Sequence, residues 1–211
     1  MASPAKAAQS LTLDDFLKMP EIDEHPYLEY HAGRIEAKMS PQGKHSSIET
    51  KLAARLDAFG EKRGLGGAFV ELRCTFAGRS LVPDIVFLRE EHIETDLTGE
   101  ILELTLRPPD IHIEVISPTQ SASKCREKLA FSIANGCPLG WLIDPSRKTV
   151  HVYRPGRPPQ PLAADAFLDG EPVLPGYRLP VTELFGWLKR PRPAPPASPS
   201  QTGSSAPEDS K

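Results

Sequence analysis

Two acidic residues stand inside apolar stretches of this sequence, where a charge is costly unless something compensates it. Asp84 follows Pro83 within residues 81–88, a run that otherwise suits a buried strand. Glu114 stands in the middle of residues 110–116, which are rich in β-branched side chains. Such carboxylates are rare in a core unless they are paired, hydrogen-bonded or bound to a metal. Taken alone, Asp84 also fits a backbone bend, and Glu114 a half-exposed sheet face or a buried ion pair.

Lys128 adds a third group of different chemistry. It stands on the helix expected after the Glu114 strand, and by itself it would count as an ordinary solvated lysine. Two carboxylates from neighbouring strands can hold one or two Mg²⁺ ions, and Mn²⁺ suits the same oxygen ligands. A bound metal activates water and neutralises charge on a phosphate, while a lysine adds a positive charge beside it. Asp84, Glu114 and Lys128 together therefore predict a metal site that hydrolyses phosphodiester bonds.

The elements that must position these residues follow from the spacing of apolar side chains. Thr12 and Asp15 form a capping-box pattern that opens a short helix. Apolar residues recur at helical steps over 48–59, and a second helix is expected over about 121–135. Extended segments are expected at residues 27–30 and 34–37, joined as a hairpin, and at residues 69–76, 81–88, 110–116, 139–143 and 149–153. The predicted fold class is α/β: a mixed central sheet of four or five strands, with helices on its faces and an N-terminal hairpin.

Composition and charge exclude several classes of protein. Of the 211 residues, 39% are hydrophobic and 25% charged, which is typical of a globular protein. The formal net charge of -3 argues against binding nucleic acid through a large basic field, but not against a local basic groove. Three cysteines without C-x-x-C spacing favour reduced thiols. The sequence shows no signal peptide and no apolar run of membrane-spanning length, so we expect a cytoplasmic protein with no membrane partner.

One folded domain with two tails is expected. Residues 1–10 form a polar, alanine-rich leader that we expect to be disordered, and residues 11–188 carry the periodic apolar pattern of the domain. Residues 189–211 are rich in proline and serine and have almost no large apolar side chains. Such a segment cannot bury enough surface to offset the entropy of ordering, so this tail is also predicted to be disordered.

Several motifs resemble the Uma family of restriction-endonuclease-like proteins, which belongs to the PD-(D/E)XK nuclease superfamily. The matching segments are residues 11–16, 28–34, 39–41 with His45, Pro83-Asp84, 114–119, 127–129 with Asn135-Gly136, and 141–145. They cover roughly residues 11–187 in the family's order. The resemblance implies a PD-(D/E)XK nuclease-like domain over residues 11–188, with a restriction-endonuclease-like fold.

The resemblance also implies roles for individual residues. Asp84 and Glu114 match the metal-binding carboxylates. The superfamily's usual lysine position falls on Ile116, so the resemblance implies that Lys128 on the following helix takes that role. Glu29 and His45 match polar positions near the same site, where Glu29 would assist the metal and His45 would contact phosphate or shuttle a proton.

The function predicted from the sequence is a Mg²⁺-dependent endonuclease acting on DNA, with Mn²⁺ as a substitute. A homodimer would suit cleavage of both strands, because one site makes one cut. Two other functions remain open at this stage. One is a nuclease-fold module with a weak or inactive site that binds nucleic acid or protein. The other is a different metal-dependent phosphohydrolase that uses the same carboxylates.

Overall fold

The computed structural model of the protein describes residues 11–38, 42–118 and 121–190. The leader predicted at residues 1–10 lies outside the described residues, and so do residues 191–211 of the predicted tail. Residues 39–41 and 119–120, which include parts of two family motifs, also lie outside them. No described helix is both long and apolar enough to cross a membrane.

A mixed sheet of six strands forms the centre of the fold, in the order β11-β10-β9-β8-β6-β3. Its strands are β3 (Gly66–Val70), β6 (Ile85–Arg89), β8 (Ile111–Val115), β9 (Leu139–Asp144), β10 (Thr149–Tyr153) and β11 (Gln160–Pro161). The pair β8 and β9 is parallel, as expected for strands joined by a helical crossover, and the other pairs are antiparallel.

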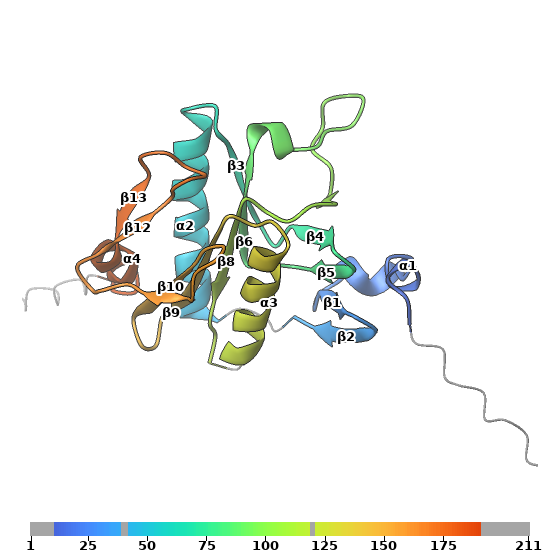
Figure 1. Ribbon diagram of the computed structural model, residues 1–211, viewed down its shortest axis with the longest axis horizontal. Coiled ribbons are helices and arrows are strands. Elements are labelled where there is room, and N and C mark those ends of the chain that lie inside the picture. The colour runs from blue at the N-terminus through green and yellow to red at the C-terminus, as the bar shows by residue number, and fades with distance from the viewer. Residues whose placement is uncertain (1–10, 39–41, 119–120, 191–211) are drawn as a thin grey trace, which may run out of the picture.

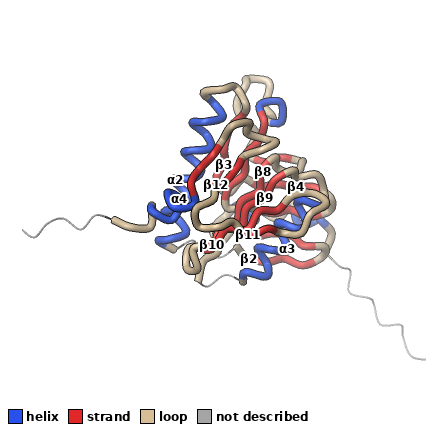
Figure 2. Tube along the Cα trace, turned by 60° about the vertical axis from the view of Figure 1, so that its left-hand side comes forward, coloured by secondary structure: helices blue, strands red, loops and turns tan. Residues whose placement is uncertain are grey.

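Two helices cover this sheet on opposite faces, α2 (Gly43–Glu61) and α3 (Ala122–Ala134) (Figures 1 and 2). The apolar stripe of α2, which includes Ile48 and Leu52, packs in one buried cluster with Ile113 and its neighbours on β8. On α3, Leu129 packs in a second cluster with Leu142 of β9. Each helix therefore buries the stripe that its period of 3.6 residues predicts.

A second sheet of five strands lies beside α3, in the order β2-β1-β5-β4-β7 (Figure 1). Its strands are β1 (Leu28–His31), β2 (Arg34–Ala37), β4 (Arg73–Phe76), β5 (Arg79–Leu81) and β7 (Leu104–Thr105). The predicted N-terminal hairpin is present as β1 and β2, and the short helix α1 (Leu13–Phe16) has the predicted capping box. The α/β fold class, with a mixed central sheet, flanking helices and this hairpin, is confirmed.

The strand predictions for residues 69–76 and 81–88 are wrong in one respect, because each run forms two strands in different sheets. The first breaks at Glu71, whose φ of 55° turns the chain from β3 into β4. The second breaks between β5 and β6 at Pro83, which has no N–H to donate to a ladder. The central sheet consequently has six strands rather than four or five, and the hairpin belongs to a sheet of its own.

The C-terminal part of the domain packs against α2. It contains β12 (Phe167–Asp169), β13 (Arg178–Pro180) and α4 (Val181–Gly186). Two short 3-10 helices, η1 (Pro20–Asp23) and η2 (Glu90–His92), lie earlier in the chain. Leu168, Leu179 and Leu184 from this part are buried in the same cluster as the α2 stripe. These strands were not expected from the sequence, because each has only three residues.

Candidate active site

Two strands of the central sheet bring Asp84 and Glu114 together. Ile85 of β6 pairs with Ile113 of β8, and continuing this antiparallel register by one residue places Asp84 opposite Glu114. The Val115 N–H donates a hydrogen bond of 2.7 Å to Asp84 Oδ2, which fixes the carboxylate at the start of β6. Asp84 is 1% exposed and Glu114 0%. Both carboxylates are thus held inside the protein by the strands themselves.

Lys128 connects Glu114 to the second sheet. Its Nζ lies 2.8 Å from Glu114 Oε1 and 3.0 Å from Glu29 Oε1, so one ammonium bridges α3, β8 and β1. Burial opposes the charge on Lys128, but Glu114 and Glu29 raise its pKa well above the usual value. The expectation that a lone helix lysine is solvated fails here, because the hairpin covers the polar side of α3.

Glu29 is ionised despite its burial. Burial raises its pKa, but the charge of Lys128 and hydrogen bonds from His31 and the Val82 N–H lower the pKa to about 2. The Val82 N–H donates to Glu29 Oε1 at 2.8 Å. Glu29 therefore gives Lys128 a second carboxylate besides Glu114.

His45 lies in the first turn of α2 and contacts Asp84. Its Nε2 is 3.0 Å from Asp84 Oδ2, and its Nδ1 is 3.5 Å from Glu49 Oε2. Burial lowers the pKa of His45, but the hydrogen bonds and charges of the two carboxylates raise it to about 9. The pKa of Asp84 moves the other way: burial raises it, but Lys38 and His45 together bring it well below its usual range.

Several residues that contact the candidate residues were missed in the sequence. His112 Nε2 lies 2.9 Å from Glu114 Oε1, and Glu49 lies beside His45. Both carried a detectable signal, since His112 shares a strand face with Glu114 at two residues' spacing and Glu49 is one helical turn after His45. Lys38 contacts Asp84 at 3.1 Å and Glu71 at 3.0 Å. Neither Lys38 nor Glu71 carries a local pattern that marks it as part of a site.

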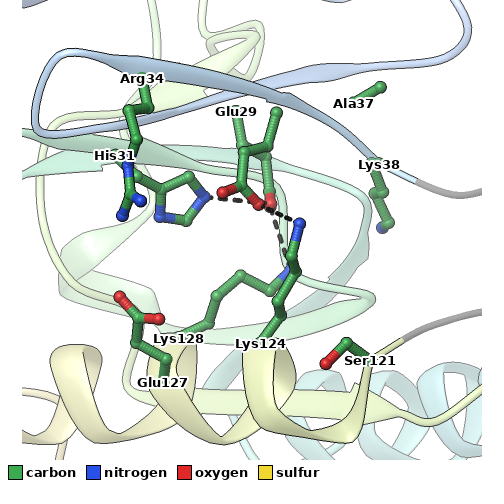
Figure 3. Close-up of a pocket in the computed structure, with 10 residues that line it drawn as sticks. Glu29, His31, Arg34, Ala37, Lys38, Ser121, Lys124, Glu127 and Lys128 are labelled. Atoms are coloured by element: carbon green, nitrogen blue, oxygen red, sulfur yellow. Dashed lines mark hydrogen bonds and ion pairs between the residues drawn. The ribbon is translucent and has the colours of Figure 1, made fainter.

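A pocket of about 380 Å³ opens between the hairpin and α3. Figure 3 shows Glu29, His31 and Arg34 projecting from the hairpin towards Lys124 and Lys128 on the helix. Lys38 lines the same pocket. The buried charged residues therefore adjoin a pocket lined by four basic side chains, Arg34, Lys38, Lys124 and Lys128, and by three acidic ones, Glu29, Glu36 and Glu127.

The five candidate residues from the sequence fall in two adjoining clusters of ion pairs and hydrogen bonds, Asp84 with His45 and Glu114 with Lys128 and Glu29. The clusters meet where the Val115 N–H, next to Glu114 in the chain, donates to Asp84. Their positions differ with respect to the pocket. Glu29 and Lys128 line it, whereas Asp84, Glu114 and His45 lie behind its wall. Over the described parts of the chain, no group of three or more histidine, cysteine or acidic side chains forms a preassembled metal cage.

Comparison with known proteins assigns this chain to a family. The family model Uma2, described as "Putative restriction endonuclease", matches residues 13–182. The chain belongs to this family, and the resemblance seen in the sequence is confirmed. No curated protein matches the chain.

A solved structure extends the comparison to the whole domain. It is described as a "putative nuclease belonging to DUF820" from Anabaena variabilis and is 38% identical to this chain. The match covers 85% of this chain and 99% of that one, with a TM-score of 0.81. The fold is thus that of a nuclease-like protein, and the family supports a nuclease-like function.

Proposed function

We propose that this protein is a metal-dependent endonuclease that hydrolyses phosphodiester bonds in DNA. The observation that carries the proposal is that two buried carboxylates on neighbouring strands, Asp84 and Glu114, lie together behind the wall of an open pocket, where Lys128 contacts Glu114. Asp84 and Glu114 would hold Mg²⁺, with Mn²⁺ as a substitute, since both ions accept oxygen ligands. Membership of a restriction-endonuclease-like family supports the same chemistry.

The donor atoms around this pair fit such an ion. Glu114 Oε2 is buried and has no hydrogen-bond partner among the described residues, so one acidic oxygen is free to bind. The two clusters together hold five carboxylates and three cationic side chains, which leaves a formal charge of about −2. Mg²⁺ needs only one or two carboxylates, because it keeps several water ligands. A site of two carboxylates therefore requires no larger cage.

The side chains around the ligands have separate tasks in this proposal. When bound, the metal supplies an activated water and neutralises charge on the phosphate. Lys128 stabilises the negative charge that develops on the phosphate, because its ammonium lies at the wall of the pocket. Glu29 holds Lys128 in place at 3.0 Å. His45 orients Asp84 through its Nε2, rather than reaching the substrate itself.

One observation favours a second candidate, a nuclease-fold module that binds nucleic acid without cutting it. Lys38 and Lys128 lie against Asp84 and Glu114, and neither carboxylate is among the described residues that line the pocket. In such a module the lysines would stay on the carboxylates and the pocket would bind phosphate only. The two candidates differ in whether a divalent metal binds and whether the substrate is cut.

Cleavage of supercoiled plasmid tests the proposal. Wild-type protein is expected to nick the plasmid with Mg²⁺ or Mn²⁺, and to make linear DNA more slowly unless two copies act together as a homodimer. Asp84→Asn and Glu114→Gln keep the shape of each side chain and remove its charge. Each should reduce the nicking rate by at least about 100-fold, as loss of a principal electrostatic contact does.

Glu61→Gln is the matched control, because Glu61 is exposed at the far end of α2 from His45. It should cut at the wild-type rate, and thermal melting should show that all variants are folded. A folded wild type that binds DNA but cuts no substrate with any metal would favour the binding module. Hydrolysis of small phosphodiesters without plasmid nicking would indicate a different phosphohydrolase.

A further inference from the structure

Lys38 has an unusual position for a lysine just after a strand. It follows β2, is 7% exposed, and places its Nζ 3.1 Å from Asp84 Oδ1. The same ammonium lies 3.0 Å from Glu71 Oε1 and donates to the Pro83 carbonyl oxygen at 3.4 Å. Lysine is almost never this deeply buried unless it is paired. Here it is paired with a residue that the proposed function assigns to the metal.

Glu71 anchors Lys38 from a strained part of the backbone. Its φ of 55° is one that residues other than glycine rarely adopt, and its N–H donates to the Asp84 carbonyl oxygen at 3.2 Å. A glycine would relieve this strain, but it would have no carboxylate to offer Lys38. The turn between β3 and β4 therefore tolerates strain in a residue that holds the lysine beside Asp84.

The two buried lysines divide the two carboxylates between them. Lys38 contacts Asp84, and Lys128 contacts Glu114. Both lysines line the pocket, whereas the described residues lining it include neither Asp84 nor Glu114. The wall of the pocket consequently offers a phosphate group these two lysines, together with the acidic Glu29, Glu36 and Glu127, while Asp84 and Glu114 lie behind it.

We propose that Lys38 is a second lysine of the reaction site, which occupies Asp84 Oδ1 in the metal-free protein and binds a non-bridging phosphate oxygen of the substrate once that carboxylate holds a metal. This inference rests on the proposed function. An ammonium and a divalent cation compete for the same oxygen, so Lys38 must give up part of its contact with Asp84 when metal binds. An ammonium has three donors, and a substrate phosphate bound in the pocket would offer its oxygens as new acceptors for Lys38.

Lys38→Met tests both halves of the proposal, because methionine keeps most of the length of the side chain and removes its charge. Metal binding is measured without substrate, by Mn²⁺ titration of the thermal melting temperature. Substrate binding is measured without cleavage, by fluorescence anisotropy of a labelled oligonucleotide in Ca²⁺. Cleavage is then measured with Mg²⁺. These three readouts separate competition for Asp84 from contact with the phosphate.

The expected changes have opposite signs. Lys38→Met should lower the Mn²⁺ concentration for half-saturation by about 10-fold, because Asp84 loses its competing cation. It should weaken oligonucleotide binding and slow cleavage by about 10-fold or more, as the loss of one charge-assisted hydrogen bond does. Lys38→Arg keeps the charge, and should recover most of the oligonucleotide affinity. Lys62→Met, on an exposed lysine after α2, should behave as wild type in all three assays.

Two results would overturn the inference while leaving the proposed function intact. One is a Lys38→Met protein that binds oligonucleotide and cleaves as wild type does. The other is weaker Mn²⁺ binding in this variant, which would make Lys38 a support for the metal site rather than its competitor. A folded wild type that shows no Mn²⁺-dependent change in melting and no cleavage would overturn both proposals. Should Lys38→Met fail to fold, Lys38→Gln removes the charge in its place, and Lys38→Arg remains the variant that keeps it.

Discussion

Replacing Glu29 by glutamine tests whether the buried ion pairs set the acid stability of the protein. Glu29 Oε1 accepts hydrogen bonds from the Val82 N–H at 2.8 Å and from Lys128 at 3.0 Å. A glutamine oxygen can accept both, so the substitution mainly removes one charge. Glu29 is 6% exposed, so solvent and salt screen its interaction with Lys128 only weakly.

The size of the effect follows from the pKa of Glu29, which falls from 4.5 to about 2 in the folded protein. Because folding lowers this pKa, the carboxylate stabilises the fold above pH 4.5, and the stabilisation is lost as the pH falls from there towards 2. One pKa unit corresponds to about 1.4 kcal/mol, so the full effect is about 3 kcal/mol, of which about 2 kcal/mol is lost by pH 3. The glutamine variant has no carboxylate to protonate at this position.

Urea unfolding at pH 7, 5 and 3, followed by circular dichroism in the presence of EDTA, measures this difference. The free energy of unfolding should fall more steeply with acid in the wild type, so its difference from Glu29→Gln should shrink by about 2 kcal/mol between pH 7 and pH 3. Glu61→Gln, on an exposed residue, should run parallel to the wild type. If the difference between wild type and Glu29→Gln stays constant over this range, the buried pair with Lys128 does not lower the pKa of Glu29.

Two further predictions concern packing and alkaline pH. A Cβ at Gly140 would lie 2.8 Å from Leu129 Cδ2 and 3.3 Å from Tyr153 Cβ, so Gly140→Ala should force the buried Leu129 side chain to shift between α3 and β9 and cost about 1–3 kcal/mol in urea unfolding. Gly186→Ala, which meets nothing within 4 Å, is its control, and equal stability of the two variants would contradict the close packing. The pKa of His45 is raised from 6.5 to about 9, so its stabilisation is present below 6.5 and lost as the pH rises through 9. Relative to His45→Gln, the wild type should lose up to about 3 kcal/mol between pH 6 and pH 10, and parallel stability curves would refute this assignment.

Local patterns in the sequence predicted most of the secondary structure and the core of the site. The α2 stripe was visible because helical packing repeats apolar residues every three or four positions. Glu114 was visible because a charge within a β-branched strand needs a partner, and Asp84 because proline and aspartate interrupt an apolar run. The family resemblance added Glu29 and His45, and implied that Lys128 takes the superfamily's lysine role. Strand periodicity from Glu114 could also have found His112, and helix periodicity from His45 could have found Glu49.

Tertiary structure alone decided which elements cover the site and which cationic side chains contact its carboxylates. Lys128 and Glu29 are 99 residues apart in the chain, and Lys38 and Pro83 are 45 apart, so no local period relates them. The breaks at Glu71 and Pro83 send adjoining segments into two sheets, and the second sheet then covers α3 and buries Lys128. The sequence by itself determined which residues carry unusual charges. Their partners depended on long-range packing, because the fold that excludes water from these charges also selects the counter-charges that stabilise them.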